Sequence, residues 1–238
     1  MVLKGKESDE YMKTCFFLSL ILFLLTTSCS TYKLEGSTSV PALNGKTLYM
    51  KTLSGDAWID LDSCEVVHGL FEMKGEVDSV ILATLCLGNE GLMPVVLETG
   101  KIKVSIENSG LHVSGTPLNE KLYDFISQKN ELESLLSDLQ HKEMQLIMDG
   151  VSANDAAAQV EAELNTLAEK MNQLIVDFVT SNFDNLLSLN VFTTFCSSFQ
   201  YPVITPFIKE IMEKAPDAFK EDDFVKEYMR MAEENAKK

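Results

Sequence analysis

The sequence predicts an α+β fold in which an N-terminal antiparallel β-sandwich or curled barrel precedes a C-terminal helical region with a long antiparallel helical hairpin. Two observations predict this class. Residues 29–115 alternate apolar and polar side chains in short runs, whereas apolar residues recur every three or four positions from Thr116 onward. Residues 1–28 are a third part, because they have the pattern of a signal peptide.

The N-terminal segment contains an apolar run from Cys15 to Leu25 that follows Lys13. A membrane-spanning helix needs about 20 apolar residues, so the shorter run favours the core of a secretory signal. Small residues then lead into Cys29, and this pattern resembles the lipobox of bacterial lipoproteins, which implies cleavage before Cys29 and lipidation of its thiol. Met12 is a better start than Met1, and an uncleaved N-terminal anchor is the alternative.

Lipidation of Cys29 would attach the protein to a membrane, because two or more acyl chains hold a protein there durably. Ser30 follows the cysteine and no acidic run comes after it. By similarity to lipoprotein sorting rules, this implies the outer membrane. We expect the periplasmic side rather than the cell surface.

The segment 29–115 is expected to form about eight short strands separated by turns that contain Gly or Asn. In the stretch KIKVSIE, the apolar residues Ile102, Val104 and Ile106 face one way and the polar residues face the other. This alternation predicts a sheet with one solvated face. His68-Gly69 lies between two apolar runs and predicts a two-residue hairpin turn.

The helical domain is expected at 116–238. Thr116 is suited to cap a helix that begins at Pro117, and Ser152 is suited to cap a second helix after a Gly-containing turn. Both helices carry heptad stripes, so they are expected to pack antiparallel as a hairpin over 117–184. The stripe residues are Leu118, Leu122, Phe125, Leu132, Leu136, Leu139 and Leu146, then Ala153, Ala157, Val160, Leu164, Leu167, Met171, Leu174 and Phe178. Shorter helices are expected at 185–199, 205–214 and 221–237.

The chain is acidic, with 36 Asp and Glu against 20 Lys and Arg and a formal net charge of −16. Arg230 is its only arginine and no basic patch is evident, so nucleic-acid binding is not expected. Beyond the N-terminal segment the cysteines are Cys64, Cys86 and Cys196, and no C-x-x-C occurs. Buried free thiols are favoured over a Cys64–Cys86 disulfide, which an oxidising compartment would allow.

The strand half resembles the domain of unknown function at the N-terminus of thiol:disulfide interchange lipoproteins of the Gram-negative envelope. The similar segments are YKLEG, NGKTLYMKT, IDLDSCEVVHGLFEMKG, PVVLETGKIKVSIE and HVSGTPLNEKLYDF. The motif positions are Leu48, Tyr49, Met50, Asp62, Ser63, Gly69, Phe71, Gly75, Glu98, Gly100, Ile102 and Gly115. The resemblance implies a fold rather than a chemistry. The thioredoxin-like C-x-x-C of those proteins has no counterpart in this sequence, so their redox activity is not carried over.

No catalytic, cofactor-binding or metal-binding residue is predicted, and an enzymatic activity is not expected. Asp60 and Asp62 would share a strand face and could form an acid–base pair, but a solvated face beside a turn is the favoured interpretation. The histidines share no metal-ligand spacing with cysteines or carboxylates; they are His68, His112 and His141. Six methionines are interpreted as core residues rather than as an adaptable groove; they are Met144, Met148, Met171, Met212, Met229 and Met231.

We therefore expect a non-catalytic outer-membrane or periplasmic lipoprotein that acts as a binding or accessory module. Its partners would be the membrane, through the lipid on Cys29, and a protein whose identity and stoichiometry the sequence leaves open. The alternative is a docking or substrate-binding module for thioredoxin-like thiol-disulfide enzymes. A glycan or small-molecule binder is a third hypothesis, and Trp58 is the only tryptophan available to it.

Overall fold

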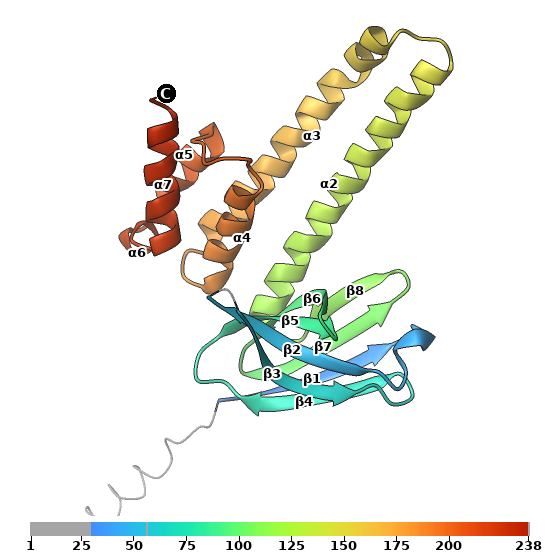
Figure 1. Cartoon of the computed structure of the whole chain (residues 1–238), viewed down its shortest axis with the longest axis vertical. Coiled ribbons are helices and arrows are strands. Elements are labelled where there is room, and N and C mark those ends of the chain that lie inside the picture. The colour runs from blue at the N-terminus through green and yellow to red at the C-terminus, as the bar shows by residue number, and fades with distance from the viewer. Residues whose placement is uncertain (1–29, 56, 238) are drawn as a thin grey trace, which may run out of the picture.

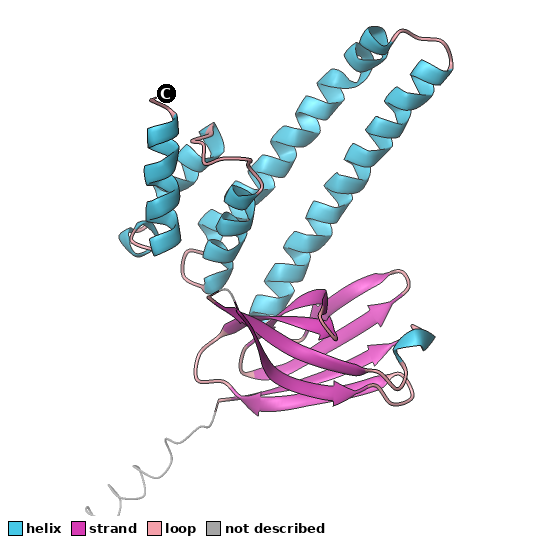
Figure 2. Cartoon of the chain, in the orientation of Figure 1, coloured by secondary structure: helices cyan, strands magenta, loops and turns pink. Residues whose placement is uncertain are grey.

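The computed structural model describes residues 30–55 and 57–237 and confirms the predicted α+β class: a β-sandwich is followed by helices (Figures 1 and 2). The predicted signal peptide and the predicted lipidation site, Cys29, lie outside the described residues. Among the residues that are described, no helix is long and apolar enough to cross a bilayer.

The sandwich consists of two four-stranded sheets with the orders β4-β1-β7-β8 and β3-β2-β5-β6. All neighbours pair antiparallel except β1 and β7, which run parallel. The strands are β1 (Thr31–Thr38), β2 (Thr47–Ser54), β3 (Ala57–Glu65), β4 (Leu70–Glu76), β5 (Ile81–Leu87), β6 (Glu90–Leu97), β7 (Gly100–Glu107) and β8 (Gly110–Ser114), with a short 3₁₀ helix η1 (Pro41–Leu43) between β1 and β2. The parallel pair arises because the chain crosses to the second sheet after β4 and returns beside β1.

The predicted two-residue period is visible in the burial of β7. Ile102, Val104 and Ile106 are buried between the sheets, while Lys101 and Lys103 are exposed. His68 and Gly69 form the predicted tight turn, with φ values of 52° and 76°.

The helices follow β8 directly, and two of them form a long antiparallel hairpin that projects from the sandwich (Figure 1). They are α2 (Pro117–Met148), α3 (Ala153–Ser181), α4 (Leu186–Ser197), α5 (Pro206–Lys214), α6 (Asp217–Lys220) and α7 (Asp223–Asn235). Ser152 caps α3 as predicted, because its Oγ accepts a hydrogen bond from the Asp155 N–H at 3.2 Å. The single-turn helix α6 was not predicted.

In the predicted stripe of α2, Leu122, Phe125 and Leu139 are buried, and the remaining residues are half-buried. The predicted stripe of α3 is wrong beside the turn, where Ala153 and Ala157 are exposed and Ala156 is buried instead. Ala157 and Ala156 lie three and four residues before Val160, and either can share its helix face. In this hairpin Ala156 is the one that is buried.

A second core lies outside the sandwich. The C-terminal half of α3 packs against α4 and α5, and α7 packs against α4. The most buried side chains of this core are Phe192, Ile208, Ile211 and Val225. The apolar run of α4 serves both cores, because Leu187 packs in the sandwich core and Phe192 in the second.

Candidate functional site

The hairpin is held to the sandwich by side chains that cross the junction in both directions. Glu98, which follows β6, accepts hydrogen bonds at one Oε1 atom from the backbone N–H groups of Leu118 (2.8 Å) and Asn119 (3.2 Å). These are N–H groups of the first turn of α2, which have no partner within the helix. A strand-end carboxylate therefore caps α2, and its negative charge lies at the positive end of the helix dipole.

Thr116 occupies the N-cap position, as predicted, but its side chain does not cap the backbone. Its Oγ1 accepts a hydrogen bond from the side-chain amide of Asn119 at 2.8 Å instead. The prediction placed the helix start correctly and assigned the cap to the wrong side chain, since Glu98 already occupies the backbone donors.

Asn119 is fully buried and completes the edge of β6. Its Oδ1 accepts from the Val96 N–H at 2.9 Å, and its Nδ2 donates to the Val96 carbonyl at 2.7 Å. Tyr123, one turn further along α2, donates its hydroxyl to the Pro94 carbonyl at 3.0 Å. β6 is an edge strand, whose outward N–H and C=O groups would otherwise lack partners, so these contacts replace a neighbouring strand.

Two hollows open between α2 and α3 along the hairpin. The distal hollow, of about 520 Å³, is lined by Leu135, Leu139 and Leu167 together with charged residues. The proximal hollow, of about 370 Å³, is lined by Phe125, Leu174 and Phe178 together with polar residues. Both therefore combine an apolar floor with a polar rim.

The rims of both hollows lie on one face of the hairpin. They step by three, four or seven residues along each helix, which is the spacing of a single helix face. The residues with this spacing are Lys121, Asp124, Gln128, Leu135, Asp138 and Lys142 on α2, then Glu163, Thr166, Lys170, Leu174, Asp177 and Ser181 on α3; all of them belong to the polar rim except Leu135 and Leu174, which belong to the floor. We call the two hollows together the hairpin groove. From Lys121 to Lys142 it extends for about 30 Å at 1.5 Å per helical residue.

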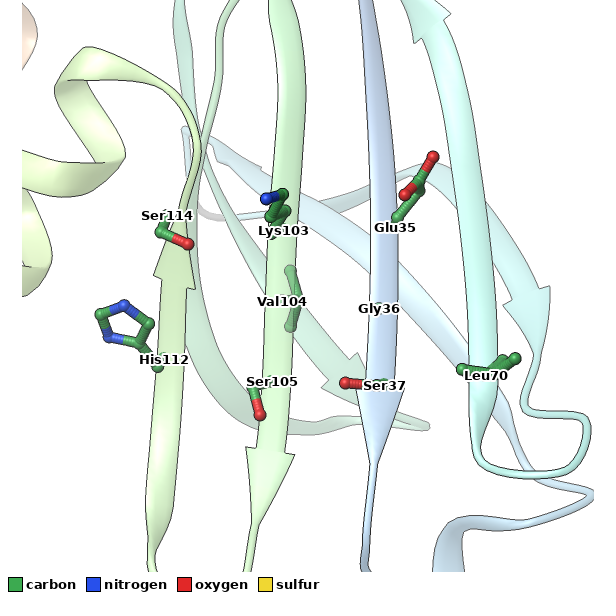
Figure 3. Close-up of a pocket in the computed structure, with 9 residues that line it drawn as sticks. All are labelled: Glu35, Gly36, Ser37, Leu70, Lys103, Val104, Ser105, His112 and Ser114. Carbon is green, nitrogen blue, oxygen red and sulfur yellow. The ribbon is translucent and has the colours of Figure 1, made fainter.

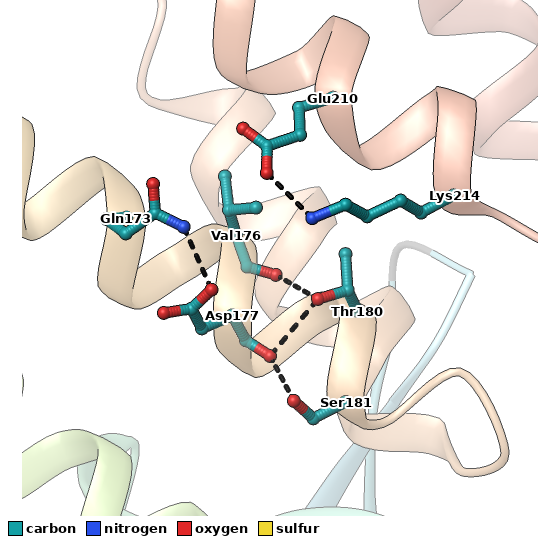
Figure 4. Close-up of polar contacts among 7 residues, drawn as sticks. All are labelled: Gln173, Val176, Asp177, Thr180, Ser181, Glu210 and Lys214. Atoms are coloured by element: carbon teal, nitrogen blue, oxygen red, sulfur yellow. Dashed lines mark hydrogen bonds and ion pairs between the residues drawn. The ribbon is translucent and has the colours of Figure 1, made fainter.

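The rim is held by polar contacts. Lys142 forms an ion pair with Glu163 across the two helices at 3.0 Å. On α3, the Gln173 side chain donates to Asp177 at 2.9 Å (Figure 4). Lys214 of α5 does not line the groove, but the charge of the rim residue Asp177 reaches it. Lys214 pairs with Glu210 at 2.7 Å, and this contact, with a weaker contribution from the charge of Asp177, raises the pKa of Lys214.

A second candidate surface is the solvated face of the first sheet, where a hollow of about 420 Å³ lies over β1, β7 and β8 (Figure 3). The strand register places Ser37, Ser105 and His112 side by side. Within the described part of the chain, however, no hydrogen bond joins Ser105 to His112. Ser105 donates instead to Glu107 at 2.9 Å, and the His112 ring meets the Tyr123 ring edge-on at 5.5 Å. These side chains therefore lack the hydrogen bond between a nucleophile and a base that a hydrolase uses.

The three thiols are free, as favoured from the sequence; Cys86 and Cys196 are buried as predicted, whereas Cys64 is only half-buried. A Cys64–Cys86 bridge is excluded by the register, because β2 lies between the two strands and pairs Leu48 with Cys64 and Tyr49 with Cys86. Strands two apart are separated by about 9–10 Å, whereas a disulfide needs Cα atoms about 4.4–6.8 Å apart.

The environment of each thiol also opposes ionisation. Burial, with a smaller contribution from the Asp62 charge, raises the pKa of Cys64 to about 11. Burial raises the pKa of Cys196 to about 12 and that of Cys86 above its usual value. A thiol attacks as the thiolate, so all three are poor nucleophiles at neutral pH.

The other residues singled out from the sequence lie apart. Asp60 and Asp62 do not share a face, because a β-bulge makes Asp60 pair with Lys51 and Asp62 with Met50. The histidines lie on a turn, on β8 and on α2, and across residues 30–55 and 57–237 no three potential metal ligands are grouped. Met144, Met148 and Met231 are exposed, so their interpretation as core residues is wrong, whereas Met171, Met212 and Met229 are partly buried against the second core.

The junction residues Glu98 and Asn119 were not identified as functional from the sequence. Glu98 stood out only as a position of the family motif, and Asn119 is a polar residue within an apolar stripe. A buried polar residue in a helix face is a signal for a specific partner, but the partner lies 23 residues away and no local pattern names it.

Comparison with known proteins identifies one family. Residues 32–122 match the family described as Domain of unknown function (DUF4369), so the chain contains this domain. No curated protein matches the chain. The matched segment extends beyond β8 into the first turns of α2, and so includes Asn119.

Proposed function

We propose that this chain, which carries the DUF4369 domain at 32–122, is a non-catalytic lipoprotein of the outer membrane, on its periplasmic side, and that its hairpin groove binds a helix of a partner protein. The anchor is supported by the sequence around Cys29. A non-catalytic role is supported by the raised pKa of each thiol and by the Ser105 hydroxyl, which donates to Glu107 rather than to His112.

The observation that carries the binding role is the hairpin groove. A hairpin of two helices leaves one side of its apolar seam without a neighbour, and a third helix can cover it by the packing used in helical bundles. The groove is long enough for about 20 residues of helix at 1.5 Å per residue. Its floor of Leu and Phe side chains suits apolar residues that recur at positions i, i+3, i+4 and i+7.

The charge of the hairpin indicates which side chains the partner helix should carry beside its apolar stripe. α2 and α3 carry 11 acidic residues and 4 basic ones, and most of this excess lies beside the groove, because the rim itself carries four acidic residues and three lysines. A partner helix with Lys or Arg beside its apolar stripe would complement this excess, whereas a second copy of the acidic hairpin would be repelled. Binding should therefore weaken as the salt concentration rises.

The experiment is photocrosslinking in the native cell, with a benzophenone amino acid placed at Leu135 or at Ser137. Leu135 lines the groove, and Ser137 lies two residues away on the opposite side of the same helix and is exposed. We expect a discrete adduct from Leu135 and none from Ser137, with a helical segment of the partner identified at the crosslink. Equal adducts from the two positions, or none from Leu135, would overturn the binding role.

The anchor is tested separately. Replacing Cys29 by alanine should release the protein from the membrane fraction and remove the acyl groups from the N-terminal peptide in mass spectrometry. A thioredoxin-like protein as the crosslinked partner would favour the alternative, a docking module for thiol-disulfide enzymes. Such docking would be non-covalent, since the thiols resist ionisation.

A further inference from the structure

An exposed apolar patch lies at one end of the sandwich. Its members are Leu53 and Trp58, each 58% exposed, and Ile59 and Val80, each 45% exposed. Leu53 and Trp58 are opposite each other in the β2–β3 pair, so their side chains lie side by side on one face. We call these four residues the end patch.

The remaining members, Ile59 and Val80, lie at the same end of the sheet. Ile59 is opposite Thr52, whose hydroxyl donates to the Leu82 carbonyl at 3.2 Å. This bond holds the end of β2 against the start of β5, and Val80 immediately precedes β5. Neighbouring residues of a strand face opposite sides of the sheet, so Leu53 and Trp58 lie on one face and Ile59 on the other. The end patch therefore wraps around the end of the β2–β3 pair, beside the start of β5.

The chain enters the sandwich at this same end. The Val77 N–H donates to the Ser30 carbonyl at 2.8 Å, and Thr31 pairs with Glu76 at the end of β4. The loop from β4 to β5 then carries the chain from Val77 to Val80 and into β5, so the first described residue and the start of β5 lie at the same end of the sandwich.

We propose that the end patch rests on the lipid surface to which Cys29 is anchored; this rests on the proposed lipoprotein function. Only Ser30 separates Cys29 from β1, and one residue spans about 3.5 Å, so acyl chains on Cys29 hold this end of the sandwich at the headgroups. Tryptophan suits that layer, because its ring is apolar and its indole N–H is polar.

The charge of the molecule identifies the kind of lipid surface. The chain has a net charge of −16, and Asp60 and Asp78 flank the end patch in sequence. Anionic lipids would repel this end, so contact should be strongest on zwitterionic phosphatidylcholine or phosphatidylethanolamine. The patch is small and orients a protein that the acyl chains already retain.

Trp58 is the only tryptophan, so intrinsic fluorescence reports on the end patch directly. The lipidated full chain is reconstituted into phosphatidylcholine vesicles with ordinary or brominated acyl chains. We expect Trp58 emission to shift to shorter wavelength on vesicles and to be quenched by the brominated lipid. The matched control carries Trp58→Phe and Met148→Trp, which moves the probe to the hairpin tip, where Met148 is 81% exposed. Its emission should remain water-like and unquenched.

The outcomes separate the two proposals. If mass spectrometry shows no acyl group on the N-terminal peptide, the lipoprotein function fails. If the acyl groups are present and bromine does not quench Trp58, the membrane contact is wrong. A blue shift without quenching that grows with protein concentration would show that a second copy covers the patch, and would also overturn the inference. Leu53→Ser with Val80→Ser should reduce quenching while the circular dichroism spectrum is unchanged.

Discussion

Replacing Asn119 by alanine would break the junction between sandwich and hairpin. The side-chain amide makes three hydrogen bonds, to the Val96 N–H, the Val96 carbonyl and the Thr116 hydroxyl, all between 2.7 and 2.9 Å. A hydrogen bond contributes about 1 kcal/mol net, and a buried group left without a partner costs about 1–3 kcal/mol. The backbone N–H and the carbonyl of Val96, a fully buried residue, would both lose their hydrogen-bond partner.

We therefore expect Asn119→Ala to lower the free energy of unfolding by about 3–5 kcal/mol. Domains are stable by only about 5–15 kcal/mol, so the change is a large fraction of the total. The measurement is urea unfolding followed by circular dichroism, with the midpoint and slope compared with those of the parent chain.

Asn190→Ala is the matched control. The Asn190 side chain makes one hydrogen bond, to the Leu186 carbonyl one turn earlier in α4, and it is only partly buried. Its loss should cost about 1 kcal/mol or less. If Asn119→Ala costs no more than Asn190→Ala, the edge of β6 does not depend on the helix and the reasoning is refuted.

Three further changes test other parts of the fold. Gly115→Ala should lower the free energy of unfolding by more than about 2 kcal/mol in the urea titration, because φ is +92° and a Cβ would lie 2.5 Å from a carbonyl oxygen of β7. Gly150→Ala is the control: φ is +93° but the space around it is open, so it should cost about 1 kcal/mol. Ser152→Ala should cost about 1 kcal/mol through loss of the α3 cap, and an unchanged thermal midpoint would contradict this. The raised pKa of Cys64, about 11, favours the neutral thiol in the folded state, so its contribution is complete below the unfolded pKa of about 8.5 and is lost as pH rises toward 11. Cys64→Ala should flatten the pH dependence of the unfolding midpoint in that window, and parallel curves would rule out the assignment.

Periodicity was sufficient to predict the two halves of the fold. The alternation in β7 and the heptad stripe of α2 each report one local geometry, so they needed no knowledge of distant contacts. The register could not be predicted in the same way, because the parallel β1–β7 pair and the bulge beside Asp60 depend on residues far apart in the chain.

The candidate site was less accessible to sequence reasoning. The heptad stripes predicted that α2 and α3 would meet, but not which side of their seam would remain open. That side is decided by the second core, since α4 and α5 pack on α3 around Val176 and Val179 and leave the face of Thr166 and Lys170 uncovered. The end patch was not predicted, because Trp58 lies in a strand whose alternation of inward and outward side chains is interrupted by the bulge.

The extent of the DUF4369 match has a physical reason in the junction. The last strand ends at Ser114, yet the match continues to residue 122. Leu122 and Tyr123 of α2 pack in the sandwich core. Without the first turns of this helix, that part of the core and the unpaired edge of β6 would be exposed. Without Glu98 the helix would begin with unsatisfied N–H groups. The start of the helix is therefore part of the β-domain, and a hairpin fixed at its base by a strand edge holds a set direction, as the proposed display of the groove away from a membrane requires.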